Sequence, residues 1–152
     1  MHIFIMRHGE ASFYATSDKE RPLTPRGEEQ AKQQGKWLLQ QGWMPDFMLV
    51  SPYLRAQQTH KQICSALKII EHSECWDNLT PYGNAYVVAD YLDMLAKDGI
   101  KNVLIISHLP LVDEIVQALG ITQPIAFHTA TLVEIAYNNG KGVLLQIKQP
   151  DI

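Results

Sequence analysis

The chain has 152 residues, of which 46% are hydrophobic and 19% charged, and its formal net charge is −3. This balance is typical of one soluble globular domain, and we expect a single domain over residues 1–152. No run of Lys or Arg and no long apolar segment is present, which argues against a nucleic-acid partner, a membrane span and a secretory signal. Cys64 and Cys75 lack a CxxC spacing, so we expect buried thiols in a reducing cytoplasm.

The N-terminal third predicts a strand, a loop and a helix. Residues 3–6 (IFIM) are an uninterrupted apolar run, which indicates a strand that is buried on both faces. A polar loop over 10–22 follows. Thr24-Pro25 then begins a helix, because threonine caps exposed amides and proline suits the first helical position. Apolar residues at helical spacing continue to a stop near Gly42.

The next segment predicts a second strand followed by a second helix. Residues 47–50 are again apolar, and Ser51-Pro52 repeats the cap-and-proline signature of a helix start. His60 lies on this predicted helix but matches no motif, and we expect it at the surface. A short strand is expected within 68–76.

The second half of the chain continues the alternation. Residues 103–106 form the most strongly apolar strand, between a helix that ends near Gly99 and another that Pro110 opens. Two strand-like runs follow at 131–137 and 143–147, and the Asn-Gly between them is a strong hairpin signal. We therefore predict an α/β fold of three layers, α/β/α, with a mostly parallel central sheet and a C-terminal antiparallel hairpin.

Cationic and imidazole side chains follow three of the predicted strands. Arg7-His8-Gly9 follows the first, Arg55 lies in the first turns of the helix after the second, and His108 follows the third. In such sheets, ligands bind beyond the carboxyl ends of the strands. Two guanidinium groups would repel a divalent ion, and no carboxylate accompanies the histidines, so we expect no metal. The same cations favour an anion, and the sequence predicts a phosphate pocket.

A histidine in such a pocket can attack phosphorus. Neutral imidazole is a competent nucleophile, and neighbouring cations lower its pKa so that it stays unprotonated near neutrality. We expect His8 to be this nucleophile, with Arg7, Arg55 and His108 stabilising the charge on the equatorial oxygens. Gly9 would let the backbone and the ligand approach each other closely. This chemistry requires neither a metal nor an organic cofactor.

Four stretches of the sequence, in order, resemble the histidine phosphatase superfamily, which includes the cofactor-dependent phosphoglycerate mutases. They are RHGE at 7–10, LTPRGEEQA at 23–31, SPYLRAQQT at 51–59 and SH at 107–108. Because the match runs over most of the chain, it is far more specific than any one motif. The small size and the stretches RPLT at 21–24 and SHLPLV at 107–112 are similar to the SixA phosphohistidine phosphatases within that superfamily.

The resemblance implies a phosphoglycerate mutase-like fold and a role for each matching residue. His8 would carry a transient phosphoryl group, and Arg7, Arg55 and His108 would form the pocket around it. Arg21 would add to the phosphate site. The connections between the predicted elements are short, so the lid insertions of larger relatives are not expected here.

The sequence departs from the superfamily at the leaving-group acid. Larger members place an acidic residue in the loop after the third strand, whereas the loop over 79–84 has no carboxylate. Asp77 and Glu10 are the candidate proton donors, with Asp18 as a weaker one. An alkoxide leaving group needs a proton, but the imidazole of a phosphoramidate leaves neutral once its ring carries a second proton. A missing acid and an open pocket therefore favour a phosphohistidine on a protein surface.

These observations predict a phosphatase that forms a covalent phosphohistidine on His8. The resemblance implies that its substrate is phosphohistidine on the histidine-phosphotransfer domain of a sensor kinase. One alternative is a small phosphomonoesterase that acts on sugar or nucleotide phosphates, and another is a catalytically silent phosphate-binding module. A mutase is disfavoured, because moving a phosphoryl group between two hydroxyls benefits from an enclosed pocket and an acid.

Overall fold

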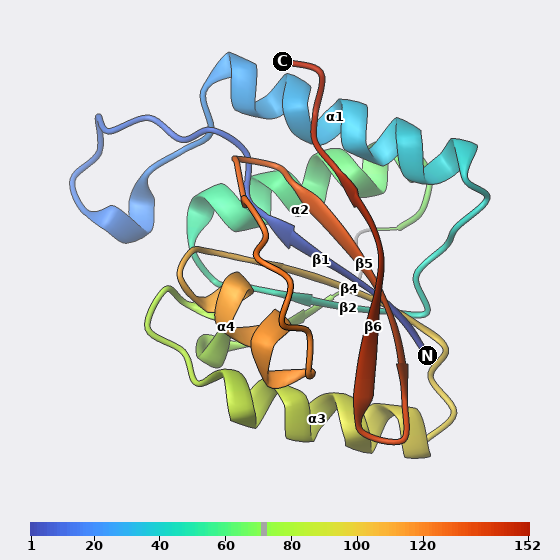
Figure 1. Cartoon of the computed structure of the whole chain (residues 1–152). Coiled ribbons are helices and arrows are strands. Elements are labelled where there is room, and N and C mark those ends of the chain that lie inside the picture. Colours follow the sequence, from blue (N-terminus) through green and yellow to red (C-terminus); the bar gives the residue numbers. More distant parts are fainter. Residues whose placement is uncertain (71–72) are drawn as a thin grey trace.

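A six-stranded sheet with the order β3-β2-β4-β1-β5-β6 forms the centre of the computed structural model, which describes residues 1–70 and 73–152 (Figure 1). The strands are β1 (His2–Arg7), β2 (Phe47–Val50), β3 (Glu74–Cys75), β4 (Asn102–Ser107), β5 (Leu132–Asn138) and β6 (Lys141–Lys148). The helices are α1 (Pro25–Gln40), α2 (Leu54–Leu67), α3 (Ala85–Lys97) and α4 (Leu111–Ala118), with 3₁₀ turns η1 (Asp18–Glu20) and η2 (Asp77–Leu79). Strands β3, β2, β4 and β1 pair in parallel, whereas β5 and β6 pair antiparallel, so the predicted sheet and hairpin are confirmed.

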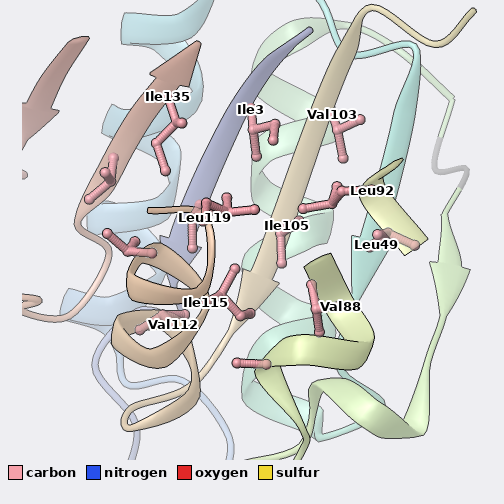
Figure 2. Packing of buried hydrophobic residues seen from close by; sticks show 14 of the residues in the cluster. Ile3, Leu49, Val88, Leu92, Val103, Ile105, Val112, Ile115, Leu119 and Ile135 are labelled. Carbon is pink, nitrogen blue, oxygen red and sulfur yellow. The ribbon is translucent and has the colours of Figure 1, made fainter. Parts of the chain in front are cut away.

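Two apolar cores cover the opposite faces of this sheet. Side chains of β1 alternate between them: Ile3 and Ile5 pack in the core under α3 and α4, whereas Phe4 and Met6 pack in the core under α1 and α2. Figure 2 shows the first core, where residues from the central strands meet the apolar sides of both helices. Because both faces are covered, the central strands are apolar throughout rather than alternating, as expected of a three-layer fold.

The parallel register brings the ends of three strands together. Arg7 of β1 lies opposite Ser107 of β4, and the next residue, His8, donates its backbone N–H to the Ser107 carbonyl at 3.0 Å. On the other side of β4, the backbone N–H of Ser51, which follows β2, donates to the carbonyl oxygen of Ile106 at 3.1 Å. The residues that follow β1, β2 and β4 therefore emerge side by side at one edge of the sheet.

The two predicted cap-and-proline helix starts have different outcomes. At the first, Thr24 caps α1 by accepting the backbone N–H of Gly27 at 3.0 Å, and Pro25 is the first helical residue, as predicted. At the second, the prediction is wrong, because α2 begins only at Leu54. The Ser51 hydroxyl accepts the backbone N–H of Tyr53 at 3.2 Å, within the connection that precedes the helix.

The predicted hairpin and short strand are both present. Asn139 and Gly140 connect β5 to β6 with φ angles of 52° and 75°, the left-handed conformation that an Asn-Gly turn supplies. The strand predicted within 68–76 is β3, while residues 71 and 72 of that range lie outside the described residues. Among the described helices, none is long and apolar enough to cross a membrane.

Two expectations for individual side chains near α2 are wrong. His60 is buried rather than at the surface, because α2 packs against α1 as well as against β2 and β4. Its Nε2 lies 3.2 Å from Sγ of Cys64, which is buried as expected. Cys75 is exposed instead of buried, because it lies on the short strand β3 at the edge of the sheet.

Candidate active site

His8 is held in a defined tautomer directly after β1. Its side chain is only 6% exposed, and its Nδ1 lies 2.7 Å from the carbonyl oxygen of Gly9. Because a carbonyl only accepts hydrogen bonds, Nδ1 carries the hydrogen and Nε2 keeps a lone pair. Burial, and to a lesser degree the charges of Arg55 and Arg7, lower the pKa of His8 to about 3, although the bond to Gly9 opposes the shift. The ring is therefore neutral at pH 7, with Nε2 available as a nucleophile.

Two guanidinium groups flank this imidazole. Arg55, in the first turn of α2 and 4% exposed, donates from Nε to Nε2 of His8 at 3.3 Å. Its terminal nitrogens bind Asp18, at 2.6 Å to the backbone carbonyl and 3.3 Å to the carboxylate. Arg7 donates one terminal nitrogen to the carbonyl of Phe127 at 3.0 Å, and its buried Nε has no partner among the described residues. Burial and the neighbouring charges of Arg55 and Arg21 lower the pKa of Arg7, but a guanidinium stays charged.

His108 lies beside His8, as the register of β1 and β4 requires. The two ring centroids are 5.0 Å apart, and His108 is only 1% exposed. Its Nε2 lies 2.7 Å from the hydroxyl of Ser51, whereas its Nδ1 has no hydrogen-bond partner among the described residues. Burial, followed by the influence of His8, Arg55 and Arg7, lowers the pKa of His108 to about 2. Both imidazoles are thus neutral at physiological pH.

These side chains line a pocket of about 290 Å³, which is the right size for a small anion and part of the group that carries it. The lining residues are Arg7, His8, Glu10, Ala11, Phe13, Arg21, Arg55, His108, Leu109 and Thr129. Three guanidinium groups and one carboxylate leave the pocket with an excess of positive charge. In the part of the chain that the structure describes, no cluster of His, Cys, Asp and Glu could hold a metal ion. The pocket therefore has the charge and the donors of a phosphate site.

Comparison with known proteins agrees with this geometry. A family model of the histidine phosphatase superfamily (branch 1) matches residues 3–80. The chain is 48% identical to the phosphohistidine phosphatase SixA homolog of Haemophilus influenzae, covering 95% of this chain and 93% of that protein. The chain belongs to the histidine phosphatase superfamily. It is also 39% identical to phosphohistidine phosphatase SixA of Escherichia coli, covering 93% of this chain and 89% of that protein.

A solved structure extends the likeness to three dimensions. The protein histidine phosphatase SixA, complexed with tungstate, matches this fold with a TM-score of 0.94 and 38% sequence identity. The alignment covers 99% of this chain and 97% of that chain. The predicted phosphoglycerate mutase-like class and the predicted similarity to the SixA phosphatases are confirmed, and the chain is a phosphatase of this superfamily.

Two weaker candidates for phosphate contact differ in where they lie. Arg21 lines the pocket, with Nε donating to the carbonyl of Ser12 at 2.9 Å and its guanidinium 4.4 Å from the ring centre of Phe13. Gly9 does not line the pocket. A Cβ at Gly9 would lie 2.6 Å from the carbonyl oxygen of Gly27, so glycine is needed there for close packing against α1.

The three candidate acids are all poorly suited to donate a proton in this phosphatase. Glu10 lines the pocket, but hydrogen bonds from Arg26 and Thr24 lower its pKa and keep it ionised. Burial raises the pKa of Asp18, yet its bonds to Arg21 and Arg55 outweigh burial and the net shift is downward. Asp77 is exposed in η2 and does not line the pocket.

Sequence reasoning missed two buried hydroxyls that connect the elements of the site. Thr59 accepts the backbone N–H of Gly9 at 3.1 Å and donates to the carbonyl of Arg55 at 2.8 Å, which ties the loop after β1 to α2. Its position four residues after Arg55, on the same side of a helix, is a signal that could have identified it. Ser51 carried no such signal, because its contact with His108 depends on the pairing of β2 with β4.

Proposed function

We propose that this phosphatase hydrolyses phosphohistidine in two steps through a phosphoryl group on Nε2 of His8. The observation that carries the proposal is the state of His8: its Nδ1 hydrogen is bound to Gly9, so the lone pair of Nε2 is directed to the side of Arg55. A neutral nucleophile among guanidinium groups is what phosphoryl transfer requires, since the protein's contribution is positioning and positive charge.

The first step forms a bond between Nε2 of His8 and phosphorus while the bond from phosphorus to the substrate's imidazole nitrogen breaks. Arg7, Arg55 and His108 stabilise the charge on the three equatorial oxygens. The substrate ring leaves neutral, because its other nitrogen carries a proton. In the second step, water attacks phosphorus, the bond to His8 breaks, and orthophosphate is released with His8 neutral again.

A phosphoramidate substrate suits the acids of this pocket. Glu10 and Asp18 are ion-paired and have lowered pKa values, so neither is a ready proton donor for an alkoxide. The relatives from Haemophilus influenzae and Escherichia coli are named as phosphohistidine phosphatases, which supports the same chemistry here. The proposed physiological substrate is a phosphorylated histidine-phosphotransfer domain, which presents its phosphohistidine on the protein surface.

Replacing the nucleophile tests the mechanism. His8→Ala should lose essentially all turnover while keeping the fold, because the imidazole that forms the intermediate is gone. His2→Ala is the matched control: His2 is an exposed histidine at the other end of β1, and its loss should leave turnover unchanged. Stopped reactions of the parent should trap an acid-labile phosphoryl group that peptide mapping places on residue 8. A His8→Ala protein that hydrolyses its substrate at the parental rate would exclude this mechanism.

A substrate panel tests the leaving group. We expect the highest kcat/KM on a phosphorylated histidine-phosphotransfer domain, a lower value on free phosphohistidine, and the lowest values on sugar and nucleotide monophosphates. Faster turnover of a monophosphate would favour the phosphomonoesterase alternative. Tight binding of the phosphoprotein without phosphate release over hours would favour a silent binding module.

A further inference from the structure

Ser51 is a fully buried residue that contacts a pocket imidazole from outside the pocket. It follows β2, does not line the pocket, and places its hydroxyl 2.7 Å from Nε2 of His108. The same hydroxyl oxygen accepts the backbone N–H of Tyr53 at 3.2 Å. A serine hydroxyl has one hydrogen to donate and two lone pairs to accept. The direction of its bond to His108 therefore follows from counting hydrogens.

Of the two possible directions, only one satisfies every buried group. If Nε2 of His108 carried the hydrogen and donated it to Ser51, the serine's own hydrogen would need another acceptor. Among the described residues, none other than His108 is in hydrogen-bond contact as an acceptor for that hydroxyl. A buried hydroxyl without an acceptor is costly. The favoured arrangement is thus a hydroxyl that donates to Nε2, which leaves the ring hydrogen on Nδ1.

The two imidazoles thus share the Nδ1–H tautomer but present different nitrogens to the pocket, for different tasks. His8 carries its hydrogen on Nδ1 because of Gly9 and keeps a lone pair on Nε2 for attack. His108 also carries its hydrogen on Nδ1, but there it is Nδ1 that lacks a protein partner while the ring lines the pocket. A nitrogen with a hydrogen and no partner, beside an anion pocket, is a donor awaiting an acceptor. In effect, one ring offers the pocket a lone pair and the other offers it a hydrogen.

We propose that Ser51 is a positioning residue that holds His108 in the Nδ1–H tautomer, so that this ring donates to a phosphoryl oxygen as charge develops in the transition state. The kinetic part of this inference rests on the proposed function, whereas the tautomer itself does not. With the opposite tautomer, His108 would present a lone pair to the phosphoryl oxygens and would repel them instead of stabilising them.

Nitrogen-15 NMR of histidine-labelled protein at pH 7 reads the tautomer directly in the absence of substrate. The parent should show His108, assigned by comparison with His108→Gln, with a protonated Nδ1 and an unprotonated Nε2. Ser51→Ala should shift the ring toward the Nε2–H form or a mixture. Ser107→Ala is the matched control, because Ser107 is also fully buried at a strand end but donates to the carbonyl of Leu79. An Nε2–H form in the parent, or an unchanged spectrum in Ser51→Ala, would overturn the inference.

Single-turnover phosphorylation of His8 measures the consequence. Ser51→Ala should slow this step on the order of 10- to 100-fold, the usual range for losing a group that orients or donates at a charged centre. In steady-state assays, its KM should change little. Ser51→Thr retains the hydroxyl and should recover most of the rate. If thermal melts show that threonine does not fit, Ser51→Cys, a weaker donor, should give an intermediate rate. An unchanged rate in Ser51→Ala contradicts the inference, and absence of turnover in the parent contradicts the proposed function while the NMR result still decides the tautomer.

Discussion

The core and the two histidines of the pocket are both buried but are chemically opposite, although the same strands build both. Ile5 and Met6 of β1 are completely buried among apolar side chains, while His8, two residues later, is nearly as buried among guanidinium groups. Burial of apolar surface in the core stabilises the fold. Burial at the strand ends desolvates ionisable groups and lowers the pKa of both imidazoles, which favours catalysis rather than stability. Stability and activity should therefore be separable by mutation.

After loss of the nucleophile itself, the largest effect on activity is expected from Arg55→Ala. Arg55 contacts His8 and contributes the most buried guanidinium in the pocket, so kcat/KM should fall on the order of 10³-fold. Arg55→Lys should recover little, because an ammonium cannot reproduce the fork of donors. Steady-state kinetics checks both variants, and Lys61→Ala, an exposed cation on the same helix, should change kcat/KM less than about 2-fold. A loss of similar size in Lys61→Ala would show that any substitution in α2 lowers activity, and that the effect is not specific to the pocket.

The converse change removes apolar contacts far from the pocket. Leu92 of α3 is fully buried in the core that Figure 2 shows. Leu92→Ala should lower the free energy of unfolding by about 3 kcal/mol, because it deletes buried methyl groups and leaves a cavity. Urea denaturation measures this loss. At a temperature where the variant stays folded, its kcat should equal that of the parent, and a marked fall in kcat would mean that the core and the pocket are coupled.

Much of the fold, and the place of the pocket in it, could be predicted from the sequence, because both depend on local sequence patterns. Apolar runs gave the central strands, Thr24 and Pro25 gave the start of α1, and Asn139-Gly140 gave the hairpin turn. The meeting of residues that follow β1, β2 and β4 was also predictable, since parallel strands end at one edge of a sheet. These inferences need only the order of the elements.

What could not be predicted depends on contacts between distant segments. Ser51 resembled a helix cap, but strand pairing places it against His108, 57 positions away in the chain. His60 resembled a surface residue, but α2 packs against α1 as well as against the sheet, and His60 is buried. The tautomer of His8 likewise follows from the orientation of the Gly9 carbonyl, which no spacing of residues reveals. Local sequence predicts which strand ends meet, and the three-dimensional contacts decide which side chains pair there and which nitrogen carries the hydrogen.

Acid should lower the free energy of unfolding through the two buried histidines of the pocket. His8 and His108 have folded-state pKa values near 3 and 2, below the ordinary value of 6.5, so the unfolded chain binds more protons than the folded one. The stability contributed by keeping them neutral is complete above pH 6.5 and is lost as pH falls below it, at up to about 1.4 kcal/mol per pH unit for each ring. Urea melts between pH 7 and pH 4.5 measure the slope.

A variant and a ligand sharpen this acid test. His8→Gln should show a shallower loss of stability with acid than the parent, because one of the two neutral rings is absent. Saturating phosphate should protect the parent more than His8→Gln, since a bound anion favours the protonated imidazole in the folded state. If the free energy of unfolding fell equally with acid in both proteins, the folded-state pKa of His8 would not be lowered, and the prediction would be wrong.

The smallest expected effect distinguishes the inside of the pocket from its rim. Phe13 is 85% exposed, lines the pocket beneath the Arg21 guanidinium, and has no role in the proposed chemistry. Its apolar surface leaves water only when a protein docks there, so Phe13→Ala should lower kcat/KM on the phosphorylated transfer domain about 10-fold. The same variant should hydrolyse a small phosphoramidate at the parental rate, whereas Val143→Ala, an exposed apolar residue of β6, should change neither rate. Equal losses on both substrates would instead place Phe13 in the chemistry of the pocket, through its contact with Arg21.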